Sequence, residues 1–282
     1  MTSTRVMLQR IPAMLLLAVV ILSGCAPRQQ QAPSHISDPA LQAQAKALWN
    51  RYIADAKARE EAAGPFRINA SLRYSTPNSG HRLVLRSWGN GIAPVRMDLE
   101  AGVGKTLALI RQDSHSFVAY DPGAGKAYVN SNSANALLRL GLPVPFGIND
   151  LGHLMAGRFN RVFPEKYLYV DLVPEGGFAY TLSARGHGSD DAEPVEGVLK
   201  LSPDAQPTEW SVGTGDRRMV LTMNNFDETD TTLPGKYAIS LGTDKSAVLL
   251  VKERSALAEP FAAQQLTLDM PEGTQIKPLP SN

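Results

Sequence analysis

Apolar side chains recur every three or four positions between residues 39 and 63, and this spacing predicts an amphipathic helix. They stand at Leu41, Ala45, Leu48, Tyr52 and Ala56. Ser37 and Asp38 offer an N-cap, and Pro39 suits the first helical position. Gly64 and Pro65 interrupt the pattern, so we expect the helix to end before them.

The period changes to two after Pro65, which predicts a succession of antiparallel strands. Phe66, Ile68, Ala70, Leu72 and Tyr74 alternate with polar residues, as on a strand with one buried face. Further strands, separated by turns rich in Gly, Pro and Asn, are expected at 82–88, 95–100, 106–111, 117–121 and 126–130. After an interruption they resume at 166–173, 178–184, 195–201, 207–212, 217–225, 236–240 and 247–252.

The interruption predicts two short helices. The first runs from Ser133 to Leu140, and the second is capped by Asn149 and closed by Gly157. Two prolines in the apolar segment 142–146 forbid helix between them. The order of helix, strands, helices and strands predicts a mainly β (α+β) fold, a strongly curved antiparallel sheet covered by helices.

The space between such a sheet and its covering helices can be either an apolar cavity or a packed core. Only the helix at 39–63 and the insert at 133–157 are available to cover it. A curved sheet closed by a few helices encloses either an apolar cavity, suited to an apolar ligand, or a fully packed interior. The hydrophobic pattern alone does not distinguish the two.

The N-terminal residues predict an export signal followed by a tether. Arg5 and Arg10 precede an apolar run from Met14 to Leu22, which is too short for a stable membrane span. Residues 26–37 are rich in Gln, Pro, Ala and Ser and have few groups to bury. We therefore expect a signal at 1–24, a tether at 25–38, one domain over 39–270 and a Pro-rich tail over 271–282, in a chain of 282 residues that is 43% apolar.

Composition and motifs argue against several kinds of chemistry. A formal net charge of +1 without a basic stripe does not favour nucleic acid as a partner. Gly104-Lys105-Thr106 ends like a phosphate-binding loop, but Leu99 stands where that loop needs a glycine. The five histidines lack metal-ligand spacing, and no Gly-x-Ser-x-Gly elbow occurs. We expect no metal, no cofactor and no enzymatic activity.

Cys25 is the single cysteine and ends the tetrad Leu22-Ser23-Gly24-Cys25, which resembles the lipobox of bacterial lipoproteins. The resemblance implies cleavage before Cys25, a diacylglycerol on its thiol and an acyl chain such as palmitate on the new amine. Several acyl chains hold a protein on a membrane. Because Ala26 replaces the aspartate that would suggest retention in the inner membrane, the implied location is the periplasmic face of the outer membrane of a Gram-negative bacterium. The alternative is a plain secretory signal with a chance cysteine.

Three segments resemble the outer-membrane lipoprotein receptor LolB, over roughly residues 40–228. The first is the Gly-x-Pro-x-Pro break within Leu140–Phe146, followed by Leu151 and Gly157. The second is the glycine-rich segment 102–106, and the third is 215–226, which resembles the closing strand of that family. The resemblance implies the fold of the LolA/LolB superfamily, an unclosed antiparallel β-barrel with a helical lid over an apolar cavity.

The resemblance also implies a function. The chain would bind the acyl chains of lipoprotein or lipid cargo, receive them from a LolA-type periplasmic carrier and act as a monomer. Val103 would be the apolar tip of a membrane-insertion loop. The candidate lid and cavity residues are Leu48, Tyr52, Phe66, Ile68, Leu72, Leu85, Met97, Leu109, Leu138, Leu142, Phe146, Leu151, Leu154 and Met155.

The chain departs from LolB in three places. Leu154 and Phe226 replace two tryptophans typical of LolB, and an extension runs from about Asp227 to Asn282. These departures keep a second function class open: a non-enzymatic structural or assembly lipoprotein of the envelope that retains the fold, packs its interior and binds a protein partner.

Overall fold

Asp38 begins the long helix α2 (Pro39–Glu61), because its carboxylate accepts a hydrogen bond from the backbone N–H of Ala40 at 2.8 Å. The helix ends before Gly64, which confirms the predicted span to within two residues. Its buried side carries Ala45, Trp49, Tyr52 and Ala56.

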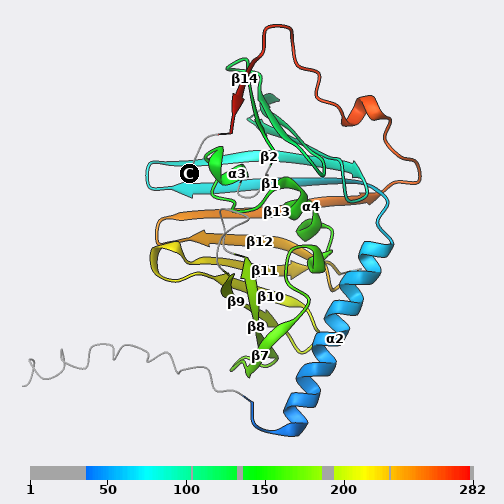
Figure 1. Ribbon diagram of the computed structural model, residues 1–282, viewed down its shortest axis with the longest axis vertical. Helices are drawn as coiled ribbons and strands as arrows, with labels where there is room; N and C mark the ends of the chain where they lie inside the picture. The colour runs from blue at the N-terminus through cyan, green and yellow to red at the C-terminus, as the bar shows by residue number, and fades with distance from the viewer. Residues whose placement is uncertain (1–35, 103, 132–135, 186–193, 229, 280–282) are drawn as a thin grey trace, which may run out of the picture. The chain divides into compact units, whose positions relative to one another are not determined.

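The computed structural model describes residues 36–102, 104–131, 136–185, 194–228 and 230–279 (Figure 1). These residues belong to one compact unit. Cys25, the predicted signal, the tether up to residue 35 and Val103 lie outside the described residues.

The described strands form one sheet of fourteen, in which the strands adjacent in sequence pair mainly as antiparallel hairpins. They are β1 (Pro65–Thr76), β2 (Ser79–Asn90), β3 (Val95–Ala101), β4 (Lys105–Gln112), β5 (Phe117–Asp121), β6 (Lys126–Asn130), β7 (Tyr167–Leu172), β8 (Phe178–Arg185), β9 (Pro194–Leu201), β10 (Pro207–Val212), β11 (Met219–Phe226), β12 (Pro234–Leu241), β13 (Lys245–Ala256) and β14 (Gln275–Pro278). The predicted mainly β fold with an unclosed, curved sheet is confirmed.

The predicted C-terminal extension supplies the middle of the sheet. The strand order is β14-β6-β5-β4-β3-β2-β1-β13-β12-β11-β10-β9-β8-β7. Within it, β13 pairs with β1 along ten residue pairs, from Phe66 with Ala256 to Ser75 with Ser246. Strands β12 and β13 therefore join an N-terminal half of the sheet to a C-terminal half (Figure 1).

The predicted Pro-rich tail also enters the sheet. Strand β14 pairs with β6 in parallel, and the N–H of Leu279 donates to the carbonyl of Val129 at 3.0 Å. The side chain of Leu279 is only 4% exposed and belongs to the hydrophobic core. The domain therefore continues past residue 270, the expected boundary.

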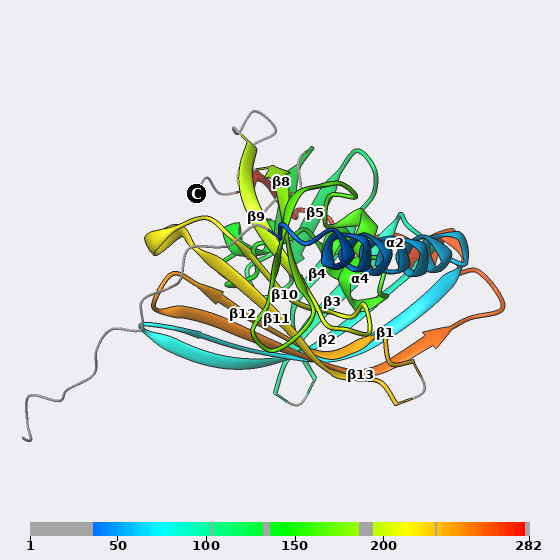
Figure 2. The ribbon, with the colours of Figure 1, turned by 90° about the horizontal axis from the view of Figure 1, so that it is seen from below.

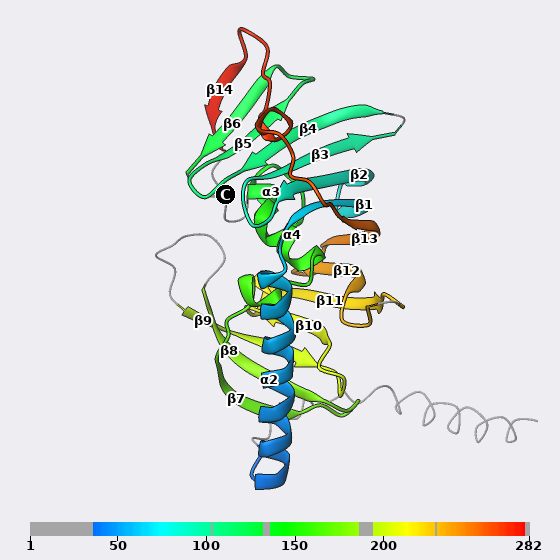
Figure 3. The same ribbon diagram turned by 90° about the vertical axis from the view of Figure 1, so that its right-hand side faces the viewer.

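The helices cover one face of the sheet, which we call the inner face (Figures 2 and 3). Besides α2 these are α3 (Ala136–Arg139) and α4 (Ile148–Met155), with the short turns η1 (Phe159–Arg161), η2 (Gly215–Arg217) and η3 (Ala263–Leu266) elsewhere in the chain. The expected strand alternation places Phe66, Ile68, Ala70 and Leu72 of β1 in the core between sheet and helices. We call the opposite face the outer face.

Candidate functional site

Helix α4 buries six of its eight residues and forms a lid over the inner face. Two prolines in the preceding segment prevent an earlier start, and the carboxylate of Asp150 accepts a hydrogen bond from the N–H of Gly147 at 3.3 Å. Gly157 lies just after the helix at φ +72°, a conformation that favours glycine. Ile148 and the five residues 151–155 are buried, so this helix is an interior element held between layers.

Three strands bind the two ends of α4. At its N-terminal end the backbone N–H of Asn149 donates to Oε1 of Gln112, on β4, at 3.3 Å. At its C-terminal end the hydroxyl of Tyr237, on β12, donates to the carbonyl of Leu154 at 2.6 Å. Nε of Arg254, on β13, donates to the carbonyl of Met155, also at 2.6 Å. The carbonyl of Leu154 also accepts from the N–H of Gly157 at 3.1 Å, so Tyr237 adds a second hydrogen bond to it, whereas Arg254 supplies a bond to the carbonyl of Met155.

Arg158 fastens the segment that follows the lid. Its side chain is only 3% exposed, its NH1 group donates to the carbonyl of Gly91 at 3.1 Å, and its guanidinium lies 5.4 Å from the centroid of the Phe66 ring. Burial lowers the pKa of Arg158. Through its contacts with the carbonyl of Gly91 and the ring of Phe66, Arg158 connects the end of the lid to the β2–β3 turn.

His153 lies on α4 itself and is 6% exposed. Burial lowers the pKa of His153 to about 4, and the nearby positive charges of Arg158 and Arg161 lower it further. The neutral imidazole is therefore the form compatible with the closed lid near neutral pH.

Helix α2 meets the other half of the sheet through aromatic rings. The indole of Trp49 lies 4.8 Å from the ring of Tyr180 and 5.3 Å from that of Tyr167, measured between centroids. The Tyr180 hydroxyl donates to the carbonyl of Ala45 at 2.7 Å, and Nε1 of Trp49 donates to the carbonyl of Glu165 at 3.2 Å. The hydroxyl of Tyr52 is buried and has no hydrogen-bond partner among the described residues.

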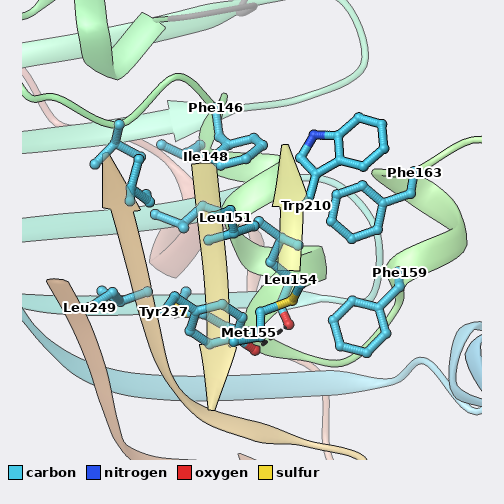
Figure 4. Packing of buried hydrophobic residues seen from close by; sticks show 14 of the residues in the cluster. Phe146, Ile148, Leu151, Leu154, Met155, Phe159, Phe163, Trp210, Tyr237 and Leu249 are labelled. Atoms are coloured by element: carbon cyan, nitrogen blue, oxygen red, sulfur yellow. Dashed lines mark hydrogen bonds between the residues drawn. The ribbon is translucent and has the colours of Figure 1, made fainter. Parts of the chain in front are cut away.

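Most of the predicted lid and cavity residues come together in one buried cluster (Figure 4). Those that are 8% exposed or less are Tyr52, Phe66, Ile68, Leu72, Leu85, Met97, Leu142, Phe146, Leu151, Leu154 and Met155. Leu48 packs against the cluster from α2 and is partly buried, and Leu138 on α3 is also partly buried. Figure 4 shows side chains of α4 directed toward Tyr237 and Leu249 of the sheet, and Trp210 beside Phe163.

Leu109 does not belong to this group, so its prediction as a cavity residue is wrong. It pairs with Asp98 and Tyr120, whereas its neighbour Ile110 pairs with Met97 and Ala119 on the inner face. Ile110 has no exposed surface, and Leu109 is partly exposed on the outer face. A shift of one residue along a strand moves the side chain to the other face.

The cluster is closely packed. The side chains of Leu85, Met97, Ile148 and Met155 have 0% accessible surface, so no water-sized space borders them. An acyl chain that used this site would have to displace α4 from the sheet.

Sequence reasoning missed the residues that hold the lid, namely Tyr237, Arg254 and Arg158. The alternation of Tyr237 with Ile239 indicates that this tyrosine faces inward, but nothing in the pattern identifies the carbonyl that its hydroxyl meets. The described residues contain no group of three or more His, Cys, Asp or Glu side chains arranged to hold a metal ion. Within the same residues, no helix has both the length and the apolar character needed to cross a membrane.

Comparison with known proteins identifies the fold. The sequence matches no protein-family model and no curated protein. A LolA superfamily protein from Nitrosomonas europaea is similar in structure, with a TM-score of 0.53 and 15% identity over 73% of this chain and 94% of that chain. A putative outer membrane lipoprotein-sorting protein domain from Vibrio parahaemolyticus has a TM-score of 0.54 and 12% identity over 77% and 94% of the two chains. A DUF1329 family protein from Desulfovibrio piger has a TM-score of 0.50 and 8% identity over 79% and 97%. At these identities the likeness shows a shared fold, the unclosed sheet with covering helices of LolA-like proteins.

Proposed function

We propose that this chain is a non-enzymatic, lipid-anchored envelope protein that binds acyl chains between α4 and the inner face of the sheet. The observation that carries the proposal is the lid itself. Helix α4 directs Ile148, Leu151, Leu154 and Met155 into the core and is held at its ends by hydrogen bonds from β4, β12 and β13. A short helix that contacts the sheet through apolar side chains and is tied by a few hydrogen bonds can move away from the sheet as a unit.

The energies of the two states allow such an exchange. Burying a methylene group contributes about 0.8 kcal/mol, so a chain of 16 carbons contributes roughly 12 kcal/mol relative to water. Each hydrogen bond that holds α4 contributes on the order of 1 kcal/mol net. The acyl chain would cover the inner face in place of the α4 side chains. The protein with a bound acyl chain would then bury about as much apolar area as the protein with α4 packed on the sheet.

The anchor and the partners follow from the resemblance to LolB. Cys25 would carry the lipid that holds the chain on the periplasmic face of the outer membrane. Cargo would arrive from a LolA-type carrier, the chain would act as a monomer, and Val103 would enter the membrane when cargo is released. The structural likeness to a putative outer membrane lipoprotein-sorting domain supports this role.

Acyl binding predicts a dependence on chain length. The Cys25→Ser variant, which removes the anchor, would be titrated with fluorescent fatty acids of 10, 12 and 14 carbons. Each added methylene should tighten binding about fourfold. An affinity independent of chain length would contradict burial of the chain in the interior.

The packed interior favours a second candidate, an assembly lipoprotein. Side chains with no accessible surface fill the site where an acyl chain would lie. Such a protein would use its surface to hold an envelope partner and would bind no fatty acid of any length. This candidate would be favoured if the Cys25→Ser chain binds none of the three fatty acids and one specific partner protein is recovered with it.

A further inference from the structure

The outer face carries a groove of about 500 Å³ that lies between the sheet and the C-terminal segment. The sheet contributes Arg67, Asn69, Arg86, Trp88 and the carboxylate of Asp98, and the segment that follows β13 contributes Phe261 and Gln265. This groove faces away from α4 and the core, so it is separate from the acyl site proposed above.

The wall formed by the C-terminal segment is fixed by hydrogen bonds to the sheet. The side-chain amide of Asn90 donates to the carbonyl of Phe261 at 2.9 Å, and its Oδ1 accepts from the N–H of the same residue at 2.7 Å. Nε1 of Trp88 donates to the carbonyl of Gln265 at 3.0 Å. Figure 3 shows the segment passing the N-terminal half of the sheet on its way to β14. The groove is therefore preformed.

Arg67 supplies the unpaired positive charge of the groove. Arg86 pairs with Glu100, and Asp98 lies 3.4 Å from Arg96. Arg67 is exposed and has no carboxylate partner among the described residues, and its guanidinium lies 5.7 Å from the centroid of the Phe261 ring. Stacking on a ring orients a guanidinium and leaves its N–H edge available for an anion.

Two further polar groups in the groove lack partners among the described residues. Asn69 donates through Nδ2 to Glu253 at 2.8 Å, but its buried Oδ1 accepts no hydrogen bond. Gln265 accepts through Oε1 from the N–H of Ala262 at 2.9 Å, which leaves its NH₂ group unused. The groove therefore offers a cation, a neutral donor and a buried acceptor.

We propose that this groove binds the carboxyl-terminal residue of a peptide. The terminal carboxylate would accept hydrogen bonds from the guanidinium of Arg67 and the NH₂ group of Gln265. The amide N–H of the same residue would donate to Oδ1 of Asn69. The rings of Trp88 and Phe261 would contact an apolar terminal side chain.

The test is fluorescence anisotropy on the full chain in mild detergent, with a labelled peptide that ends in Gly-Gly-Leu and its C-terminal amide. We expect the free acid to bind about tenfold more tightly than the amide, because the amide loses the charge-assisted hydrogen bond. Arg67→Gln should remove this preference, and Arg73→Gln, an exposed arginine on the same strand outside the groove, should retain it. Thermal unfolding of both variants establishes that they are folded.

Several results would overturn the proposal. They are equal binding of acid and amide, no binding at millimolar protein, or an unchanged preference in folded Arg67→Gln. Inorganic phosphate that displaces the peptide as effectively as an unlabelled copy of it would show that only the negative charge is recognised. A fatty acid should not compete with the peptide, because the groove and the proposed acyl site are different sites. Failure of peptide binding would therefore leave the proposal of acyl binding unaffected.

Discussion

The hydroxyl of Tyr237 lies 2.6 Å from the carbonyl oxygen of Leu154 and donates a hydrogen bond to it. This bond joins β12, in the middle of the sheet, to the C-terminal end of α4. Tyr237 belongs to the extension that follows the LolB-like segments. The extension therefore both completes the sheet and closes the lid.

Replacing Tyr237 by phenylalanine should destabilise the closed lid. The substitution keeps the ring and removes this bond, while the N–H of Gly157 still donates to the carbonyl of Leu154 at 3.1 Å, so the free energy of unfolding should fall by about 1 kcal/mol. Urea unfolding measures the change. Tyr74→Phe is the matched control, because the Tyr74 hydroxyl has no hydrogen-bond partner among the described residues, and it should change stability little. If the two variants are equally stable, the bond does not hold the lid.

Leu151 tests the packing beneath the lid. Its side chain is 2% exposed, and Leu151→Ala should lower the free energy of unfolding by about 2–5 kcal/mol through lost burial and a residual cavity. Leu168 is 56% exposed, so Leu168→Ala should remain within about 0.5 kcal/mol of the parent. A small change in the free energy of unfolding for Leu151→Ala would mean that α4 does not pack closely against the sheet.

Acid should loosen the lid through His153. An unfolded histidine takes up a proton near pH 6.5, whereas the pKa of His153 in the fold is lowered to about 4. The unfolded state binds more protons between these values, so stability contributed by His153 is present above pH 6.5 and is lost as the pH falls toward 4. The loss should approach roughly 3 kcal/mol.

The pH dependence of unfolding measures this effect as a difference between variants. His153→Gln should flatten the profile between pH 6.5 and 4, and replacement of the exposed His81 by Gln should leave it unchanged. Taking the difference cancels the carboxyl groups common to all three chains, including the half-buried Asp150, whose pKa is raised by desolvation. Parallel profiles for all three proteins would show that His153 is not buried as described.

Truncation tests whether the C-terminal region is integral. A chain that ends at residue 226 loses β12 and β13 and leaves the paired edges of β1 and β11 open, so it should be insoluble or lack cooperative unfolding. A chain that ends at residue 270 loses only β14 and the buried Leu279 and should fold with reduced stability. A soluble, cooperatively folded chain of 226 residues would contradict the central position of β13.

Local signals predicted the elements well. The cap at Asp38 and the break at Gly64 define α2 within two residues, and the alternation from Phe66 to Tyr74 correctly identifies the buried face of β1. These features depend on neighbouring residues, so a single sequence contains them.

The sequence could not resolve which face an unbroken apolar run presents. Residues 107–110 are all apolar, and the pairing of β3 with β4 shifts between Leu99 and Glu100. Without alternation, Leu109 and Ile110 are equivalent candidates for the core, and only the register of the sheet distinguishes them.

Long-range pairing was likewise beyond the sequence pattern. Leu72 lies opposite Leu249 in the sheet, but the alternation in each strand is satisfied by any antiparallel neighbour. The contacts of Tyr237 and Arg254 with α4 depend on this same arrangement. The groups that hold the lid could therefore not be found before the strand order was known.

The most direct test of acyl binding is mass spectrometry of lipid extracted from the purified Cys25→Ser protein. Because this variant lacks the thiol that would carry the proposed anchor, any acyl chain in the extract is bound cargo. We predict that about one lipid molecule or more accompanies each folded chain and that Leu151→Arg, which places a charge beneath the lid, reduces this amount. Repeated recovery of folded Cys25→Ser protein with no lipid would contradict the account.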